Sequence, residues 1–139
     1  VFFTNYLSEK GISIEHHSKV GLSFHWPPLE RQVIIKGEAE KISSIDSDNY
    51  FNSRPKGSKI GAIVSEQSKV ISDRSIMEAK LEALEIKYQN EEIKRPDHWG
   101  GYLVRPISIE FWQGRPNRLH DRIRCQLKSG FWSLERLAP

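Results

Sequence analysis

The chain has 139 residues, of which 37% are hydrophobic and 28% charged, and its formal net charge is +3. This length suits one domain with a core of its own, so we predict a single domain over residues 1–139. No apolar run approaches the ~20 residues of a membrane span, and the basic residues are spread along the chain. Composition therefore argues against a membrane anchor and against a nucleic-acid partner.

The single cysteine, Cys125, excludes an internal disulfide and a cysteine-based zinc site. The five histidines lack ligand spacings such as H-E-x-x-H, so we predict no metal site. With no Asn-x-Ser/Thr sequon either, a reducing, cytoplasmic location is expected. The apolar opening Val1-Phe-Phe-Thr-Asn5 resembles the middle of a sheet, so we expect further sequence upstream.

The first part of the chain favours strands. We predict them at residues 1–5, 19–26 and 31–42, with a polar connection over residues 6–18. Pro27-Pro28 cannot continue a ladder and should end the second strand. Gly37 is a candidate for a bulge in the third.

The middle of the chain favours helices, at residues 44–53, 59–68 and 76–89. Ser43 is the expected N-cap of the first, and Ser75 with Glu78 forms a capping-box pattern for the last. The last helix has an apolar stripe, predicted to face the core, made of Met77, Leu81, Leu84 and Tyr88.

Three further strands are predicted at residues 102–112, 119–128 and 131–137, with Ser129-Gly130 as a hairpin turn between the last two. Strands at both ends and helices between them indicate an α+β domain built on a mostly antiparallel barrel or sheet.

Two clusters of residues suggest anion binding. Tyr50 and Arg54 are four residues apart on a predicted helix, and Ser58 follows the next turn, so the three polar groups suit a phosphate. The alternative is a surface helix end whose arginine pairs with a carboxylate.

The second cluster is Arg118, His120 and Arg122, which alternate along a predicted strand and should share one face. The nearby Trp112 and Trp132 favour a planar, phosphorylated ligand. The alternative is a solvated strand face with surface charge pairs.

Catalytic motifs are absent. The chain has no G-x-S-x-G, no complete phosphate loop and no G-x-G-x-x-G. If the protein is an enzyme, we therefore expect a bound cofactor to carry the chemistry.

Many short motifs, in order from the first residue to the last, together resemble the pyridoxine/pyridoxamine 5'-phosphate oxidase family. They include Phe3-Thr4-Asn5, Leu29-Glu30-Arg31-Gln32-Val33, Ser53-Arg54-Pro55, Gln67-Ser68, Trp99-Gly100-Gly101-Tyr102, Glu110-Phe-Trp-Gln-Gly114, Arg118-Leu-His-Asp-Arg122 and Arg136-Leu-Ala-Pro139.

The resemblance implies an FMN-binding split β-barrel that works as a homodimer with FMN at the interface. It also implies oxidation of pyridoxamine or pyridoxine 5'-phosphate to pyridoxal 5'-phosphate, with hydride passing to the flavin and O2 then giving H2O2. By this resemblance the FMN contacts would be Phe3, Thr4, Lys10, Gln32, Gln67, Ser68, Trp112 and Arg122. The substrate phosphate would be held by Tyr50, Arg54 and Ser58, and the catalytic pair facing the substrate ring would be Arg118 and His120.

Two features depart from the family pattern. Glu9 stands where the family usually has a basic residue, which predicts weaker FMN binding, and the family's preceding strand is absent. Two other functions stay open: a related flavin oxidase of the phenazine-biosynthesis type, and a non-catalytic binder of FMN or pyridoxal phosphate.

Overall fold

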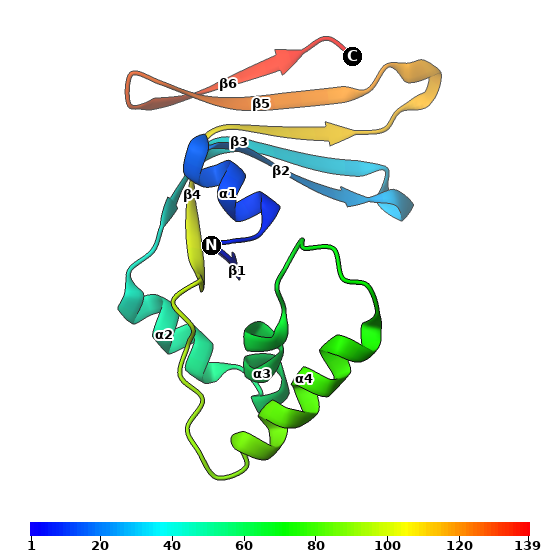
Figure 1. Cartoon of the computed structure of the whole chain (residues 1–139). Helices are drawn as coiled ribbons and strands as arrows, with labels where there is room; N and C mark the ends of the chain where they lie inside the picture. Colours follow the sequence, from blue (N-terminus) through cyan, green and yellow to red (C-terminus); the bar gives the residue numbers. More distant parts are fainter. The chain divides into compact units, whose positions relative to one another are not determined.

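The computed structural model describes residues 1–139, and their helices and strands fall into two units (Figure 1). The first unit comprises Val1–His17 and Lys41–Leu103, and the second comprises Ser18–Glu40 and Val104–Pro139. The mixture of helices with an antiparallel sheet confirms the α+β class, while one domain over the whole chain stays a prediction. None of the helices is both long and apolar enough to cross a membrane.

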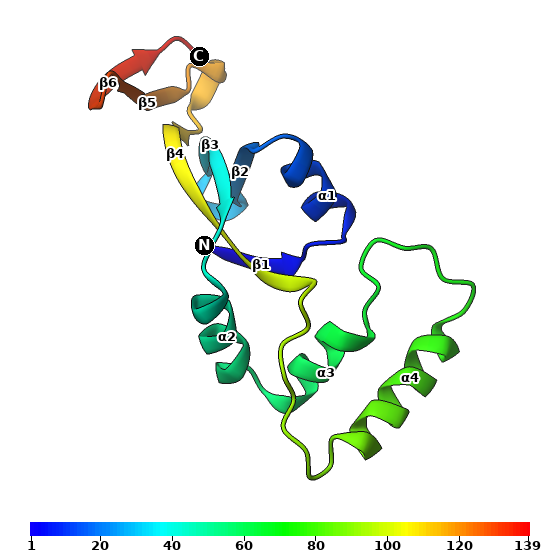
Figure 2. The same ribbon diagram turned by 60° about the vertical axis from the view of Figure 1, so that its left-hand side comes forward.

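The first unit contains most of the helices: β1 (Phe2–Asn5), α1 (Glu9–His16), α2 (Ser44–Ser53), α3 (Lys56–Val64), α4 (Arg74–Lys87) and the start of β4 (Trp99–Gln113). Figures 1 and 2 show β1 beside the first part of β4, and the two pair antiparallel with Phe2 opposite Tyr102. Phe51, Ile60 and Trp99 form its buried core.

Helix α1 corrects the prediction of a plain polar connection over residues 6–18. Ser8 is its N-cap: the buried hydroxyl accepts a hydrogen bond from the Gly11 amide (3.1 Å) and donates one to the Asn5 carbonyl (2.7 Å). A Cβ at Gly11 would collide with the Tyr6 backbone, so this helix packs closely on the chain that precedes it. The helix brings Lys10 into its first turn.

The other helices agree with the predictions except at their ends. Helix α2 has the predicted bounds and the predicted cap, Ser43. Helix α3 lies three residues earlier than predicted at its start, and residues 65–68 follow it as a turn. Helix α4 is capped by Asp73 rather than Ser75, whose amide donates to the Asp73 carboxylate (2.7 Å). The stripe is confirmed in part, because Leu81, Leu84 and Tyr88 pack against the core of this unit.

The second unit is mainly sheet: β2 (Lys19–Trp26), most of β3 (Arg31–Lys41), the rest of β4, β5 (Asp121–Lys128) and β6 (Phe131–Leu137), in that order. Short 3-10 turns lie at Pro27–Leu29 and Pro116–Arg118. The β2–β3, β4–β5 and β5–β6 pairs are antiparallel. The Ser129-Gly130 hairpin is confirmed, and both residues have positive φ, as a two-residue turn of this kind requires.

No bulge occurs at Gly37 in the pairing with β2, because the register between β2 and β3 is uninterrupted from Lys19 opposite Glu38 to Trp26 opposite Arg31. A Cβ at position 37 would overlap the backbone of Arg105 and Pro106. Glycine is therefore needed here for close approach of the next strand, the other common reason for glycine inside a strand.

Candidate functional site

The predicted site residues fall into two groups, one in each unit, and each group is described by itself. In the first unit, Tyr50, Arg54 and Ser58 lie around the junction of α2 and α3. Arg54 is the C-cap of α2: its φ of -75° is still helical, and its ψ of 148° turns the chain into Pro55, as expected before a proline. Tyr50 and Arg54 both lie beside the Trp99 ring, and their stacking on one helical face stays a prediction. Ser58 lies in the first turn of α3, which has no side-chain cap, so amide groups at this helix end are available to an anion.

The Arg54 guanidinium is held under aromatic rings. Its central carbon lies 4.6 Å from the centre of the Trp99 ring and 5.9 Å from that of Phe51. One terminal nitrogen, Nη1, is buried without a hydrogen-bond partner. Leaving such a donor unpaired costs on the order of 1–3 kcal/mol, and an anionic oxygen of a ligand would remove that cost.

Phe3, on β1, joins this group through ring stacking. Its ring centre is 3.7 Å from that of Tyr50, with the planes 12° apart, and 5.6 Å from that of Trp99. Tyr50 is therefore fixed by an aromatic contact from β1, which sets the direction of its phenol without using the hydroxyl.

Thr4 and Gln67, predicted to contact the same cofactor, are brought together. The Gln67 carboxamide oxygen accepts hydrogen bonds from the Thr4 hydroxyl and from the Asn5 amide, both 3.3 Å. Ser68 follows in the left-handed region (φ 74°), and the Asn5 side chain donates to the Ser65 carbonyl (3.3 Å). The turn at residues 65–69 is thus attached to β1.

Glu66 attaches the same turn to α4. Its two carboxylate oxygens accept from Lys80 (2.8 Å) and from Lys69 (3.0 Å). These hydrogen bonds, that of Lys80 first, lower the pKa of Glu66 to about 2. Lys10, by contrast, is exposed on α1, with its ammonium 5.8 Å from the centre of the Phe2 ring.

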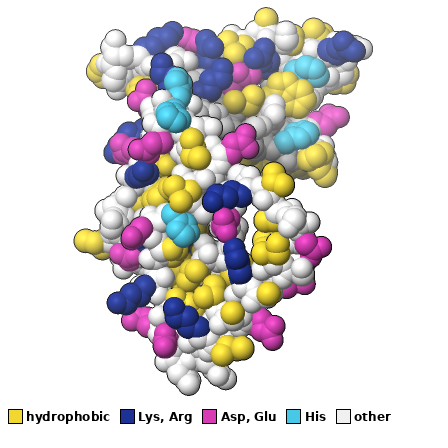
Figure 3. All heavy atoms as spheres, viewed as in Figure 1, with side chains coloured by type: hydrophobic (Ala, Val, Ile, Leu, Met, Phe, Trp, Pro, Cys, Tyr) yellow, Lys and Arg dark blue, Asp and Glu magenta, His cyan; other side chains and the backbone are white.

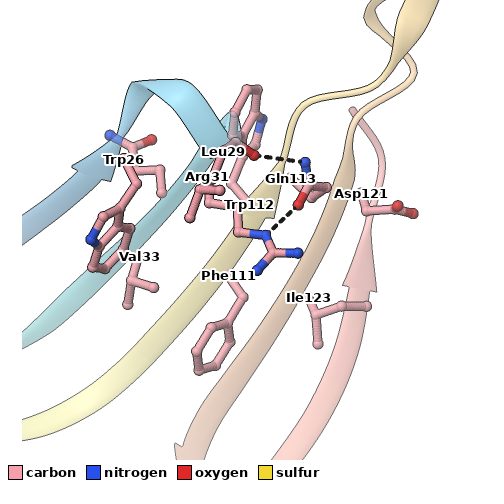
Figure 4. A pocket seen from close by; sticks show the side chains of 10 residues that line it. Trp26, Leu29, Arg31, Val33, Phe111, Trp112, Gln113, Asp121 and Ile123 are labelled. Atoms are coloured by element: carbon pink, nitrogen blue, oxygen red, sulfur yellow. Dashed lines mark hydrogen bonds between the residues drawn. The ribbon is translucent and has the colours of Figure 1, made fainter.

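In the second unit, a cavity of about 450 Å³ is lined by two predicted site residues, Gln32 and Trp112. Figure 4 shows this cavity from close by. Its other lining residues are mostly apolar and come from β2, the 3-10 turn at Pro27–Leu29, β3, β4 and β5: Trp26, Leu29, Arg31, Val33, Phe111, Gln113, Asp121 and Ile123. The Gln32 carboxamide donates to the Ser23 hydroxyl (3.0 Å). Aromatic and aliphatic walls with a few polar groups suit a flat, partly polar ligand.

The predicted row of Arg118, His120 and Arg122 on one strand face is wrong. Strand β5 begins only at Asp121, so Arg122 alone lies on it. Asn117 (φ 59°) and Arg118 (φ 61°) are both left-handed, which breaks any alternation. Residues 114–120 therefore form a loop between β4 and β5, called here the β4–β5 loop.

His120 is oriented by two contacts. Its ring lies 4.8 Å from the Trp112 ring, tilted by 46°, and its Nδ1 accepts from the Arg115 amide (3.2 Å). A neutral ring that accepts at Nδ1 carries its proton on Nε2. Next to it, Asp121 accepts from Arg115 (2.7 Å) and Arg136 (2.9 Å), and these bonds lower the pKa of Asp121.

Arg122 is paired rather than free. It donates to Glu110 (2.8 Å) and to the Ala138 carbonyl (3.0 Å), and the hydrogen bond with Glu110 raises the pKa of the guanidinium. Figure 3 shows other basic side chains gathered over β5 and β6. Trp132 is half-exposed on β6 and does not line the cavity that contains Trp112.

Sequence reasoning missed Gln113 and Arg31, although both stand in motifs quoted above. Arg31 donates from Nε to the Gln113 carboxamide oxygen (2.7 Å) at the rim of the cavity. A single glutamine at a strand end gives no periodic signal, so only the structure identifies it.

Comparisons with known proteins cover both units. A family model described as pyridoxamine 5'-phosphate oxidase matches residues 1–88, and one described as pyridoxine 5'-phosphate oxidase C-terminal dimerisation region matches residues 99–139. A pyridoxine/pyridoxamine 5'-phosphate oxidase of Flavobacterium johnsoniae is 60% identical over 139 residues, which are 99% of this chain and 65% of that protein. One of Cyanothece is 54% identical over 99% of this chain and 65% of its own length. The chain thus spans about 65% of the relatives it matches.

Two solved structures are also similar. PhzG from Burkholderia lata 383, in complex with tetrahydrophenazine-1-carboxylic acid, has a TM-score of 0.90 at 25% identity and covers 99% of this chain and 67% of its own. A pyridoxamine 5'-phosphate oxidase-related, FMN binding protein from Nostoc punctiforme has a TM-score of 0.74 at 15% identity, over 99% of this chain and 72% of its own. These likenesses confirm the predicted split-barrel fold.

Proposed function

Because the chain belongs to the pyridoxamine 5'-phosphate oxidase family, we propose that it takes part in the FMN-dependent oxidation of pyridoxamine or pyridoxine 5'-phosphate to pyridoxal 5'-phosphate. O2 is the proposed electron acceptor and H2O2 the second product. The observation that carries the proposal is the buried, unpartnered Nη1 of Arg54 beside the uncapped start of α3, because this pair of features suits a phosphate group.

The residues present fit FMN in chemical type. The cavity with Trp112 and Gln32 offers apolar walls and an amide to a flat ring system, and Thr4, Gln67 and Ser68 offer hydroxyl and amide groups. Lys10 is an exposed cation for the cofactor phosphate. When bound, FMN supplies the two-electron acceptor that the side chains of this protein lack.

The remaining residues are proposed to bind and orient the substrate. Arg54, Tyr50 and Ser58 hold its phosphate, and Arg118 with His120 faces its ring. With Nδ1 engaged by the Arg115 amide, a neutral His120 presents only an Nε2 proton to the substrate. Arg122, held in place by Glu110, would contribute a guanidinium group to the cofactor site, where it would favour negative charge.

The phosphate assignment is tested with Arg54→Ala. Loss of a charge-assisted contact should raise the KM for pyridoxine 5'-phosphate by about tenfold or more, while the Kd for FMN changes by less than about threefold. Arg74→Ala is the control, because Arg74 pairs only with Glu78 at the exposed start of α4. An unchanged KM in Arg54→Ala would reject the assignment.

Turnover is tested by the absorption spectrum of the FMN-loaded protein without oxygen. Pyridoxamine 5'-phosphate should bleach the flavin, and admission of air should restore the colour and release peroxide. A yellow protein that does not bleach would favour a non-catalytic binder.

A second candidate function is a flavin oxidase of the phenazine type, favoured by the TM-score of 0.90 with PhzG. The ligand in that PhzG structure is a carboxylic acid, whose carboxylate can also pair with an arginine, so the two candidates differ in substrate rather than in the need for Arg54. Bleaching by an unphosphorylated aromatic carboxylate, without bleaching by pyridoxamine or pyridoxine 5'-phosphate, would favour this candidate.

We also propose that the protein is a homodimer in the cytoplasm. The dimer is supported by the match of residues 99–139 to a dimerisation region and by exposed apolar side chains on β6, among them Phe131, Trp132 and Leu134. The cytoplasmic location is proposed from the single cysteine together with the lack of an Asn-x-Ser/Thr sequon.

A further inference from the structure

Gln113, the last residue of β4, connects two turns at one end of the second unit. Its Nε2 lies within hydrogen-bond distance of three carbonyl oxygens, those of Leu29 (3.2 Å), Glu30 (3.3 Å) and Gly114 (3.3 Å). Its Oε1 accepts from Arg31 (2.7 Å), and Figure 4 shows this bond at the rim of the cavity. The side chain therefore uses both its donor and its acceptor functions.

The backbone makes the same connection. The Gly114 amide donates to the Glu30 carbonyl (2.7 Å). A Cβ at position 114 would lie 2.8 Å from the Glu30 side chain, so this approach requires glycine. Glu30 is itself left-handed (φ 48°), which turns its carbonyl toward the β4–β5 loop at the end of the 3-10 turn. The turn between β2 and β3 and the start of the β4–β5 loop are thus joined by hydrogen bonds.

The next link in the chain of contacts reaches a predicted catalytic residue. Gly114 precedes Arg115, whose amide donates to His120 Nδ1 and whose guanidinium binds Asp121. The position of Gly114 therefore sets that of Arg115, and Arg115 sets the orientation of His120. Arg118 lies inside the same loop and has a left-handed backbone conformation. Such a conformation is unfavourable for arginine and persists only where surrounding contacts hold it.

We propose that Gln113 is a positioning residue for the reaction proposed above. It holds the β4–β5 loop against the β2–β3 turn, so that His120 and Arg118 are already arranged when substrate binds. Such pre-organisation lowers the entropy lost in reaching the reactive geometry. The inference rests on the proposed function, and it goes beyond it by assigning a role to a glutamine at the rim of the cavity that acts through its contacts with two turns.

The test compares Gln113→Glu and Gln113→Leu with wild type. Glutamate is similar in size but places a carboxylate against three carbonyl oxygens, whereas leucine removes all polar contacts without adding charge. Gln126→Leu is the matched control, because Gln126 makes one amide-to-carbonyl bond, to Ile107 (3.0 Å), elsewhere in the same unit.

Two measurements on the FMN-loaded proteins are expected to change together. Hydrogen exchange of the Gly114 and Arg115 amides, followed by NMR, should be about tenfold faster or more in both Gln113 variants. The kcat/KM for pyridoxine 5'-phosphate should fall by about tenfold, while the Kd for FMN stays within about threefold of wild type. General destabilisation of the fold would instead weaken both substrate turnover and FMN binding. Gln126→Leu should leave all three quantities near wild type.

Unchanged exchange at Gly114 and Arg115 would overturn the inference. So would faster exchange with unchanged kcat/KM, because the loop would then be loosened without consequence for the reaction. Failure of the proposed function would give a different result, because wild type itself would not turn over. The positioning role of Gln113 in the reaction would then be rejected, while the exchange rates would still report whether Gln113 orders the loop.

Discussion

Glu9 and Lys10 are neighbours in the first turn of α1 and carry opposite charges. A carboxylate at the start of a helix is favourable for the helix, by about 0.3–1 kcal/mol, but it opposes an anion at Lys10. We predict that Glu9→Arg lowers the Kd for FMN severalfold, as measured by flavin fluorescence titration. The matched control is Glu82→Arg, the same charge change on exposed α4. Equal Kd values for wild type and Glu9→Arg would contradict the prediction.

For single residues, the sequence predicted which residue types form the candidate site better than it predicted how they are arranged. Tyr50, Arg54 and Ser58 suit a phosphate by their chemistry, but the start of α3, which carries Ser58, is directed by the extended ψ of Arg54 before Pro55. The unpaired Nη1 under Trp99 depends on contacts across 45 positions of sequence, which spacing cannot predict. Gln113 shows the same limit, since its partners come from a distant turn.

Among the elements, the turn at residues 65–69 depends on α4 through the ion pair of Glu66 with Lys80. We predict that Lys80→Met weakens FMN binding by about threefold to fivefold, because the turn carries Gln67 and Ser68, and that high salt reduces the difference. Lys80→Arg should restore the affinity.

Arg74→Met serves as the control for Lys80→Met, since it breaks an exposed ion pair on the same helix that does not involve the turn. FMN titrations in which Lys80→Met and Arg74→Met match wild type would show that the turn keeps its shape without α4.

Elements with clear capping or turn residues at both ends were predictable in their bounds, whatever their length. The bounds of α2, β2 and β6 agree with the sequence patterns, because each has clear capping or turn residues at its ends. Helix α1 buries only Gly11 and Ile14, which gives little periodic signal over eight residues. The predicted strand at residues 119–128 starts two residues before β5, because Arg118, His120 and Arg122 alternate in sequence although Arg118 and the preceding Asn117 are left-handed in a 3-10 turn.

For the whole molecule, stability should fall in acid. Glu66 and Glu135 have pKa values of about 2 in the fold, mainly through hydrogen bonds from lysines, against an ordinary 4.5. A lowered pKa in the folded state stabilises the fold above the unfolded pKa, and this contribution is lost as pH falls from about 4.5 toward 2. We therefore predict that Tm, measured by circular dichroism, is nearly constant from pH 7 to about 5 and falls below that.

The acid effect has its own control, the double variant Glu66→Gln, Glu135→Gln, which should show a shallower fall of Tm below pH 4.5. The groups are exposed, so 1 M salt should also flatten the wild-type curve. A double variant with the wild-type dependence on pH would assign the acid sensitivity to other carboxylates.

The proposed dimer can be tested on β6. Leu134 is 72% exposed within the residues matched to a dimerisation region, and Ile86, on α4, is 68% exposed outside them. We predict that Leu134→Glu shifts sedimentation from dimer to monomer, since a buried unpaired carboxylate is costly at an interface, while Ile86→Glu does not. A wild-type monomer, or a dimer indifferent to Leu134→Glu, would reject this interface.

The division of both units into segments bears on the order in which the chain is synthesised. The β2–β3 hairpin lies in Ser18–Glu40, but the strands that complete its sheet come from Val104–Pro139, with 63 residues of the other unit made in between. A ribosome adding about 5–20 residues per second would leave that hairpin without its neighbours for several seconds. During this interval Phe24, Trp26 and Leu29, which remain partly exposed even in the finished fold, are available to chaperones or to wrong partners.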